Sequence, residues 1–138
     1  MVHTRSCVPV SIDTRLDGHN ATNLRTAAEV ESAIARMDVV LTTHLHGWVL
    51  ALKNGVPVLA LDSVSGGAKV TAQAQAVDWP VYSIDRLDPA EWARAFDVYL
   101  TDEARAPARS CAATAVRTID ELRTEFLVLP IFDAVCTA

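Results

Sequence analysis

Residues 38–70, with the sequence DVVLTTHLHGWVLALKNGVPVLALDSVSGGAKV, constrain the fold more than any other part of the chain. The apolar, β-branched run over 38–43 has the length of a strand, and a second apolar run covers 56–61. Between them, residues 47–53 carry apolar side chains at helical spacing, and Gly55 marks the end of that helix. Two apolar strands joined by a helix are typical of parallel pairing in a sheet covered on both faces.

Polar residues follow both strands, at the places where parallel α/β sheets bind ligands. The loops at the carboxyl ends of parallel strands form the ligand crevice of such sheets. If the backbone stays extended after the first strand, residues two apart face the same side, so two imidazoles would share one crevice. The following helix start adds free N–H groups and a positive dipole end, which suit an anion. The candidate site residues are Thr43, His44 and His46 after the first strand, and Ser65, Gly66, Gly67 and Lys69 after the second.

The glycine-containing segment is an anion-binding candidate of low specificity. A Gly-Gly pair between a strand and a helix lets backbone amides approach an anion, and Lys69 adds a positive charge. The spacing differs from that of a nucleotide phosphate loop, because Val70 follows the lysine. A tight turn with an exposed lysine is the competing interpretation. The chain contains neither Gly-x-Ser-x-Gly nor Gly-x-Gly-x-x-Gly, which disfavours a hydrolase or a dinucleotide-binding protein.

We predict no metal ion and no cofactor. His44 and His46 form a His-x-His pair, but a zinc site needs at least a third ligand, and only Asp62 or His19 is available to supply it. The three cysteines are odd in number and have no short paired spacing, which argues against a disulfide framework.

The remaining segments continue the alternation of strands and helices. We expect a first strand over 8–12, then a turn-rich loop in which Arg15, His19 and Arg25 either contact an anion or face solvent. Thr26 and Glu29 form a capping box that begins a helix. Later elements are a helix over 70–77, a strand over 81–84, a helix after Asp88, a long helix over 108–126 and an apolar tail over 127–132 that docks on the domain or covers a partner.

This order predicts one α/β domain over residues 1–138, a Rossmann-like three-layer sandwich with a mainly parallel sheet. A length of 138 residues fits one domain. Seventeen acidic residues outnumber twelve basic ones, and the net charge of -5 argues against nucleic acid or anionic membranes as partners. The chain has no apolar run of about 18 residues and no signal-peptide pattern, so we expect a cytoplasmic protein.

The run THLHGWVLALKNGVPVLALD, with SGGAK behind it, resembles the C-terminal part of the polysaccharide pyruvyl transferase family over about residues 25–85. That family carries an Arg-Leu-His-Gly element, an apolar helix, a Gly-Val-Pro-Val strand and a lysine a few residues later. In this chain the element is His44-Leu45-His46-Gly47, the strand motif begins at Gly55, and the lysine is Lys69. His44 occupies the position of the family's arginine, and a histidine does not reproduce the bidentate fork of an arginine.

The resemblance implies a transferase that moves a pyruvyl group from phosphoenolpyruvate to two hydroxyls of a saccharide, giving a ketal and phosphate. It implies that His46 donates a proton, and that His44, Lys69 and the glycine loop hold the anion. It also implies a GT-B-like enzyme whose N-terminal partner domain this chain lacks, so a second copy of the chain or a separate partner would complete the cleft. Two alternatives remain: a non-catalytic anion-binding or assembly domain, and the nucleotide-sugar-binding domain of a glycosyltransferase.

Overall fold

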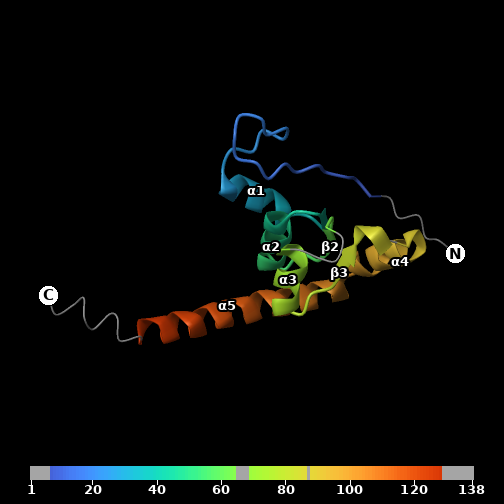
Figure 1. Cartoon of the computed structure of the whole chain (residues 1–138). Coiled ribbons are helices and arrows are strands. Elements are labelled where there is room, and N and C mark those ends of the chain that lie inside the picture. The colour runs from blue at the N-terminus through green and yellow to red at the C-terminus, as the bar shows by residue number, and fades with distance from the viewer. Residues whose placement is uncertain (1–6, 65–68, 87, 129–138) are drawn as a thin grey trace.

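The computed structural model describes residues 7–64, 69–86 and 88–128, and these form an α/β structure around a parallel sheet (Figure 1). The described residues contribute three strands, in the order β1 (Val40–Thr42), β2 (Val58–Asp62) and β3 (Val81–Ser83). Both neighbouring pairs are parallel. The carboxyl ends of all three strands therefore lie at one edge of the sheet. The predicted α/β class and parallel sheet are confirmed.

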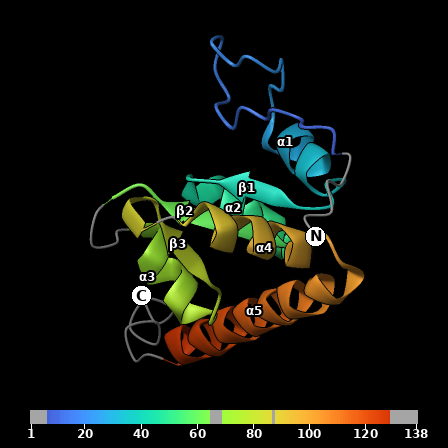
Figure 2. The ribbon, with the colours of Figure 1, turned by 90° about the vertical axis from the view of Figure 1, so that its right-hand side faces the viewer.

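The described residues also form five α-helices. They are α1 (Ala27–Ile34), α2 (Leu45–Lys53), α3 (Lys69–Ala76), α4 (Pro89–Tyr99) and α5 (Arg105–Leu127), with 3-10 turns at Ile84–Arg86 and Asp102–Ala104. Figure 2 shows α5 along one side of the molecule, with α1 at the opposite side. Within the described ranges, no helix is long and apolar enough to cross a membrane.

Strand β2 is the central strand of the sheet. Its consecutive residues Val58, Leu59 and Ala60 are all fully buried. Because neighbouring residues of a strand point to opposite faces, burial of all three means that both faces of β2 are covered. The helices α2, α3 and α4 each contact β2. This arrangement agrees with the predicted Rossmann-like sandwich.

Two helix starts follow from local hydrogen bonds that the sequence predicts. At α1, the Thr26 hydroxyl accepts the N–H of Glu29 (3.2 Å), and the Glu29 carboxylate accepts the N–H of Thr26 (2.9 Å). At α4, the Asp88 carboxylate accepts the N–H of Ala90 (2.9 Å), and Pro89 is the first helical residue. Such caps stabilise a helix end by roughly 1 kcal/mol each.

Gly55 ends α2 and also permits close packing of α5. Its φ of +65° lies in the left-handed region. The N–H of Gly55 donates to Leu52 O (2.8 Å) and the N–H of Val56 donates to Ala51 O (2.9 Å), which is the Schellman arrangement. A Cβ on Gly55 would lie 2.7 Å from the Cγ of Arg109 in α5. Both the left-handed backbone and the close approach of Arg109 therefore favour a glycine at this position.

The predicted first strand over 8–12 is wrong. This segment has no strand structure, and Val8 and Val10 are exposed. A short apolar run forms a strand only where a sheet edge pairs with it, and this run does not pair with β1. Other differences are at boundaries: β1 and β2 each begin two residues later than expected, and α2 begins two residues earlier than expected. Of the predicted tail, only Leu127 and Val128 are among the described residues, and both are exposed.

Candidate functional site

The turn between β1 and α2 is held by the last residue of the strand. The hydroxyl of Thr42 accepts the N–H of His44 (3.0 Å). A Cβ on Gly47 would lie 2.8 Å from this same hydroxyl oxygen, closer than side chains tolerate. The glycine of the His-Leu-His-Gly element therefore lets the first turn of α2 approach the end of β1.

The two histidines lie in this turn, in different backbone conformations. His44 is the N-cap of α2 with extended backbone (φ -107°, ψ 133°), and its Nδ1 lies 3.1 Å from the Thr43 hydroxyl. His46 belongs to the first turn of the helix, so the extended geometry that would align the two imidazoles ends at His44. Both histidines are exposed. The structure thus places Thr43, His44 and His46 together at the carboxyl edge of the sheet.

The start of α2 also offers backbone donors. The first intrahelical hydrogen bond joins Trp48 N–H to His44 O (3.1 Å). The amides of the three preceding residues, Leu45, His46 and Gly47, therefore have no acceptor within the helix. Free amides and the positive end of the helix dipole favour an anion at this position.

The connection after β2 is organised by a buried carboxylate that sequence reasoning did not select as a site residue. Asp62 is 3% exposed. Its carboxylate accepts the N–H of Val64 (3.0 Å), the hydroxyl of Thr71 (2.6 Å) and the N–H of Thr71 (3.2 Å). It joins the end of β2 to the first turn of α3. In the sequence, the position of this aspartate at the end of an apolar run could have indicated such a role.

The remaining predicted residues of this connection are placed only in part. Lys69 is the first residue of α3 and is exposed. Ser65, Gly66 and Gly67 lie outside the described residues, so their part in an anion site stays a prediction.

A hollow of about 300 Å³ lies at the carboxyl end of β3, at the same edge of the sheet. The rings of Tyr82 and Trp92 meet edge to face there, with centroids 5.5 Å apart. Trp92 is half-buried. The hollow is lined by Val81, Tyr82, Ser83, Arg86, Asp88, Glu91 and Trp92.

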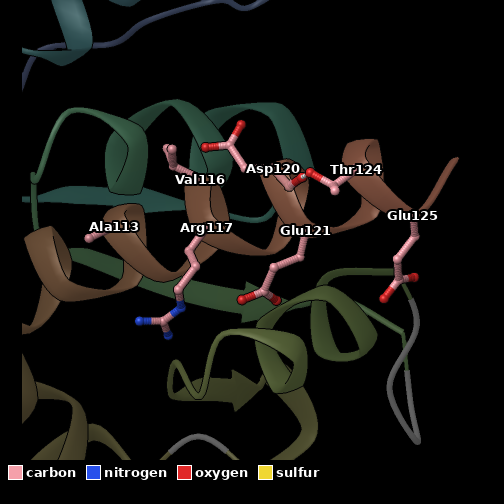
Figure 3. A pocket seen from close by; sticks show the side chains of 7 residues that line it. All are labelled: Ala113, Val116, Arg117, Asp120, Glu121, Thr124 and Glu125. Carbon is pink, nitrogen blue, oxygen red and sulfur yellow. Dashed lines mark hydrogen bonds between the residues drawn. The ribbon is translucent and has the colours of Figure 1, made fainter. Parts of the chain in front are cut away.

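A second hollow lies along α5, away from the strand ends. Figure 3 shows Arg117, Glu121 and Glu125 pointing to one side of this helix. All of its described lining residues come from α5, so it does not include the histidine turn. They are Ala113, Val116, Arg117, Asp120, Glu121, Thr124 and Glu125.

The cations of the loop over 13–25 are used within that loop. The guanidinium of Arg15 contacts the Asp13 carboxylate (2.6 Å) and donates to His19 O (3.0 Å). Hydrogen bonds from Arg15 hold the pKa of the Asp13 carboxyl well below its usual range. Arg25 donates to Asp17 O (2.7 Å). Both views place this loop beyond α1, on the side of the molecule opposite α5 (Figures 1 and 2). These contacts favour a structural role for Arg15 and Arg25 over anion binding.

A metal site does not emerge from the described part of the chain. Within those ranges, no three His, Cys, Asp or Glu side chains come together in a way that could hold a metal ion. The oxygens of Asp62, which was considered as a third ligand for the histidine pair, instead accept hydrogen bonds from Val64 and Thr71.

The fold is that of a Rossmann-like α/β protein. A polar turn joins β1 to α2 at the carboxyl ends of the strands. Residues 8–65 match the family model of the polysaccharide pyruvyl transferases, a partial match covering fewer than half of the residues. The resemblance is confirmed for this part, which contains the histidine turn and β2. The match differs from the expected range of 25–85: it includes the loop before α1 and ends before Lys69. No curated protein and no solved structure matches the chain.

Proposed function

We propose that this chain binds phosphoenolpyruvate as one half of a transferase that moves the pyruvyl group to a saccharide. The observation that carries the proposal is that the family match over residues 8–65 contains the histidine turn, which lies at the carboxyl edge of a parallel sheet. The free amides at the start of α2 add an anion-binding feature that the sequence match alone does not supply.

The anionic donor would be held from two sides. The amides at the start of α2 and the imidazole of His44 would contact the phosphate or the carboxylate of phosphoenolpyruvate. Lys69 and the segment Ser65–Gly67 would contact it from the connection after β2. Because β1 and β2 are neighbours, roughly 4.8 Å apart, the two connections leave the sheet side by side.

His46 would act as the proton donor. An acceptor hydroxyl attacks C2 of phosphoenolpyruvate while the vinyl carbon gains a proton and becomes a methyl group. Phosphate then leaves with its electron pair, and the second hydroxyl of the saccharide bonds to the same carbon and closes the ketal. Each hydroxyl loses one proton, and these protons balance those gained by the vinyl carbon and the phosphate. Histidine suits such a role because it exchanges protons near neutral pH.

Calorimetric titration with phosphoenolpyruvate tests the proposal. We expect binding by the unaltered chain and its loss in His46→Ala. His19→Ala is the matched control, because His19 is also exposed but lies in the loop before α1. Circular dichroism should show the same unfolding curve for all three proteins. Equal binding by His46→Ala and the unaltered chain would remove His46 from the site, and absence of binding at millimolar donor would contradict a donor site on this chain.

A non-catalytic binding domain is the second candidate, and exposure of both histidines favours it. Group transfer between two large substrates benefits from a cleft that excludes water. In this candidate, the chain binds phosphoenolpyruvate but releases no phosphate when a saccharide is added. If a separate N-terminal domain or a second copy completes the cleft, phosphate release appears only with that partner present. Affinity for a nucleoside diphosphate sugar in place of phosphoenolpyruvate would instead indicate a glycosyltransferase domain.

A further inference from the structure

The hollow at the carboxyl end of β3 combines aromatic and polar side chains. Its volume of about 300 Å³ lies at the lower end of the range of small-molecule sites, which is roughly 300–1,000 Å³. Tyr82 comes from β3 and Trp92 from α4, and both side chains are half-buried. The 3-10 turn Ile84–Arg86 lies between these two elements in the chain (Figure 1). The hollow therefore offers an aromatic surface with polar groups around it.

The aromatic surface is anchored to the sheet by further contacts. The rings of Tyr82 and Trp92 meet edge to face, with centroids 5.5 Å apart. Burial raises the pKa of Tyr99 to about 12, and a hydrogen bond with Tyr82 contributes to this shift. Tyr99 stacks on Trp79 with centroids 5.9 Å apart, and the Trp79 indole N–H donates to Val58 O of β2 (2.9 Å). A surface that is already ordered loses little conformational entropy when a ligand binds to it.

The charges of the hollow favour a neutral ligand over an anion. Its described lining includes the cation Arg86 and the carboxylates Asp88 and Glu91, so negative charges outnumber the positive one. The Asp88 carboxylate also accepts the N–H of Ala90 (2.9 Å), which offsets the positive end of the α4 dipole from within the chain. The start of α2 differs, because its described N-cap residue, His44, makes no such side-chain bond. Phosphate and phosphoenolpyruvate are therefore disfavoured in the hollow.

We propose that the hollow binds one neutral hexopyranose ring of a saccharide. The C–H face of such a ring is apolar and packs against aromatic side chains, whereas its hydroxyl groups lie around the edge and form hydrogen bonds. Tyr82 and Trp92 supply the aromatic contact. The carboxylates of Asp88 and Glu91 accept hydrogen bonds from hydroxyl groups, and the guanidinium of Arg86 donates to them.

The register of the sheet places the hollow level with the histidine turn. Thr42 pairs with Ala60, and Ala60 also pairs with Val81. Tyr82 and Thr43 each follow by one residue, so they lie at the same height along the strands. Because β2 lies between β1 and β3, the two positions are roughly 10 Å apart. A ring in the hollow is therefore beside the donor region, and its identification as part of the acceptor saccharide rests on the proposed function.

Tryptophan fluorescence during titration with methyl glycosides tests saccharide binding. Trp92 is half-buried, whereas the other two tryptophans, Trp48 and Trp79, are buried. A sugar ring that covers Trp92 should therefore change the emission and reduce quenching by acrylamide. The probes are the methyl glycosides of glucose, galactose, mannose and N-acetylglucosamine at millimolar concentrations. We expect saturable binding of at least one probe to the full chain, and absence of a response to all four overturns the proposal.

Two variants assign the binding to the hollow. Glu91→Gln keeps the size of the side chain and removes its charge, and should weaken saccharide binding about tenfold because a charged acceptor is lost. Trp92→Leu should abolish binding, as measured by saturation-transfer NMR of the probe. Glu125→Gln is the matched control, the same change at an exposed residue of the hollow along α5, and should bind like the unaltered chain. Circular dichroism should show unchanged unfolding for both glutamine variants. Equal affinity in Glu91→Gln and the unaltered chain, or a loss confined to Glu125→Gln, overturns the proposal.

Titration of the same proteins with phosphoenolpyruvate separates this inference from the proposed function. Glu91→Gln should bind phosphoenolpyruvate like the unaltered chain, and His46→Ala should bind the methyl glycoside like the unaltered chain. Saccharide binding without phosphoenolpyruvate binding would contradict the donor site and support the hollow as a saccharide site. Phosphoenolpyruvate binding without saccharide binding overturns the saccharide site alone. Loss of phosphoenolpyruvate binding in Glu91→Gln would assign the hollow to the donor and also overturn it.

Discussion

The connections that follow β1 and β2 at the carboxyl edge of the sheet differ in the group that holds them and in its burial. The turn after β1 is held by a hydroxyl, that of Thr42, and the histidines it presents are exposed. The connection after β2 is held by the carboxylate of Asp62, which is buried and accepts hydrogen bonds from Val64 and Thr71. A neutral bond at the surface contributes little to stability, whereas a buried charged acceptor is costly to remove. Substitutions of the exposed histidines should therefore change stability less than substitution of Asp62 does.

The largest expected effect comes from Asp62→Ala. Asp62 is itself buried, and its removal leaves the N–H groups of Val64 and Thr71 and the Thr71 hydroxyl without this acceptor, so we expect the free energy of unfolding to fall by about 3 kcal/mol. Urea denaturation measures this change. Asp85→Ala is the control, an exposed aspartate that should change stability by less than about 0.5 kcal/mol. A loss below about 1 kcal/mol for Asp62→Ala would remove the contrast between the two connections.

The next effect concerns ligand affinity rather than stability. His44→Arg restores the arginine of the resembled family in the exposed turn, and a guanidinium can hold phosphate or carboxylate with two parallel hydrogen bonds. We expect phosphoenolpyruvate to bind about tenfold more tightly, which corresponds to roughly 1.4 kcal/mol. Calorimetry measures the affinity, and the same sample should unfold at an unchanged urea concentration. Weaker binding by this variant would indicate that the imidazole itself makes the contact.

The smallest expected effect tests the packing of the turn. An alanine is normally favoured over a glycine within a helix by about 1 kcal/mol. In Gly47→Ala we expect a loss of about 1 kcal/mol instead, because the new Cβ meets the Thr42 hydroxyl and disturbs its bond to His44. Thermal unfolding of Gly47→Ala in a Thr42→Ala background provides the control. There the alanine should be neutral or stabilising, and an unchanged loss would show that the hydroxyl is not the cause.

The sequence predicted the elements that depend on neighbouring residues. The capping box at Thr26 and the cap at Asp88 form as expected, because each bond spans two or three residues. The two apolar runs predicted the parallel strands β1 and β2, and the polar residues after the first run predicted the turn that follows β1. The role of Asp62 was not predicted, because its partner Thr71 is nine residues away across the connection.

By itself, the sequence determined the capped starts of α1 and α4, the parallel strand pair and the family resemblance of part of the chain, since these depend on local patterns and short-range hydrogen bonds. The tertiary structure decided which segments pair and which are exposed. Residues 8–12 have strand propensity but do not pair with β1, and α5 has one apolar pattern in which Ala108 is fully buried whereas Ile119 and Leu122 are exposed. Burial and pairing depend on remote segments meeting in space, and a pattern within one segment does not specify them.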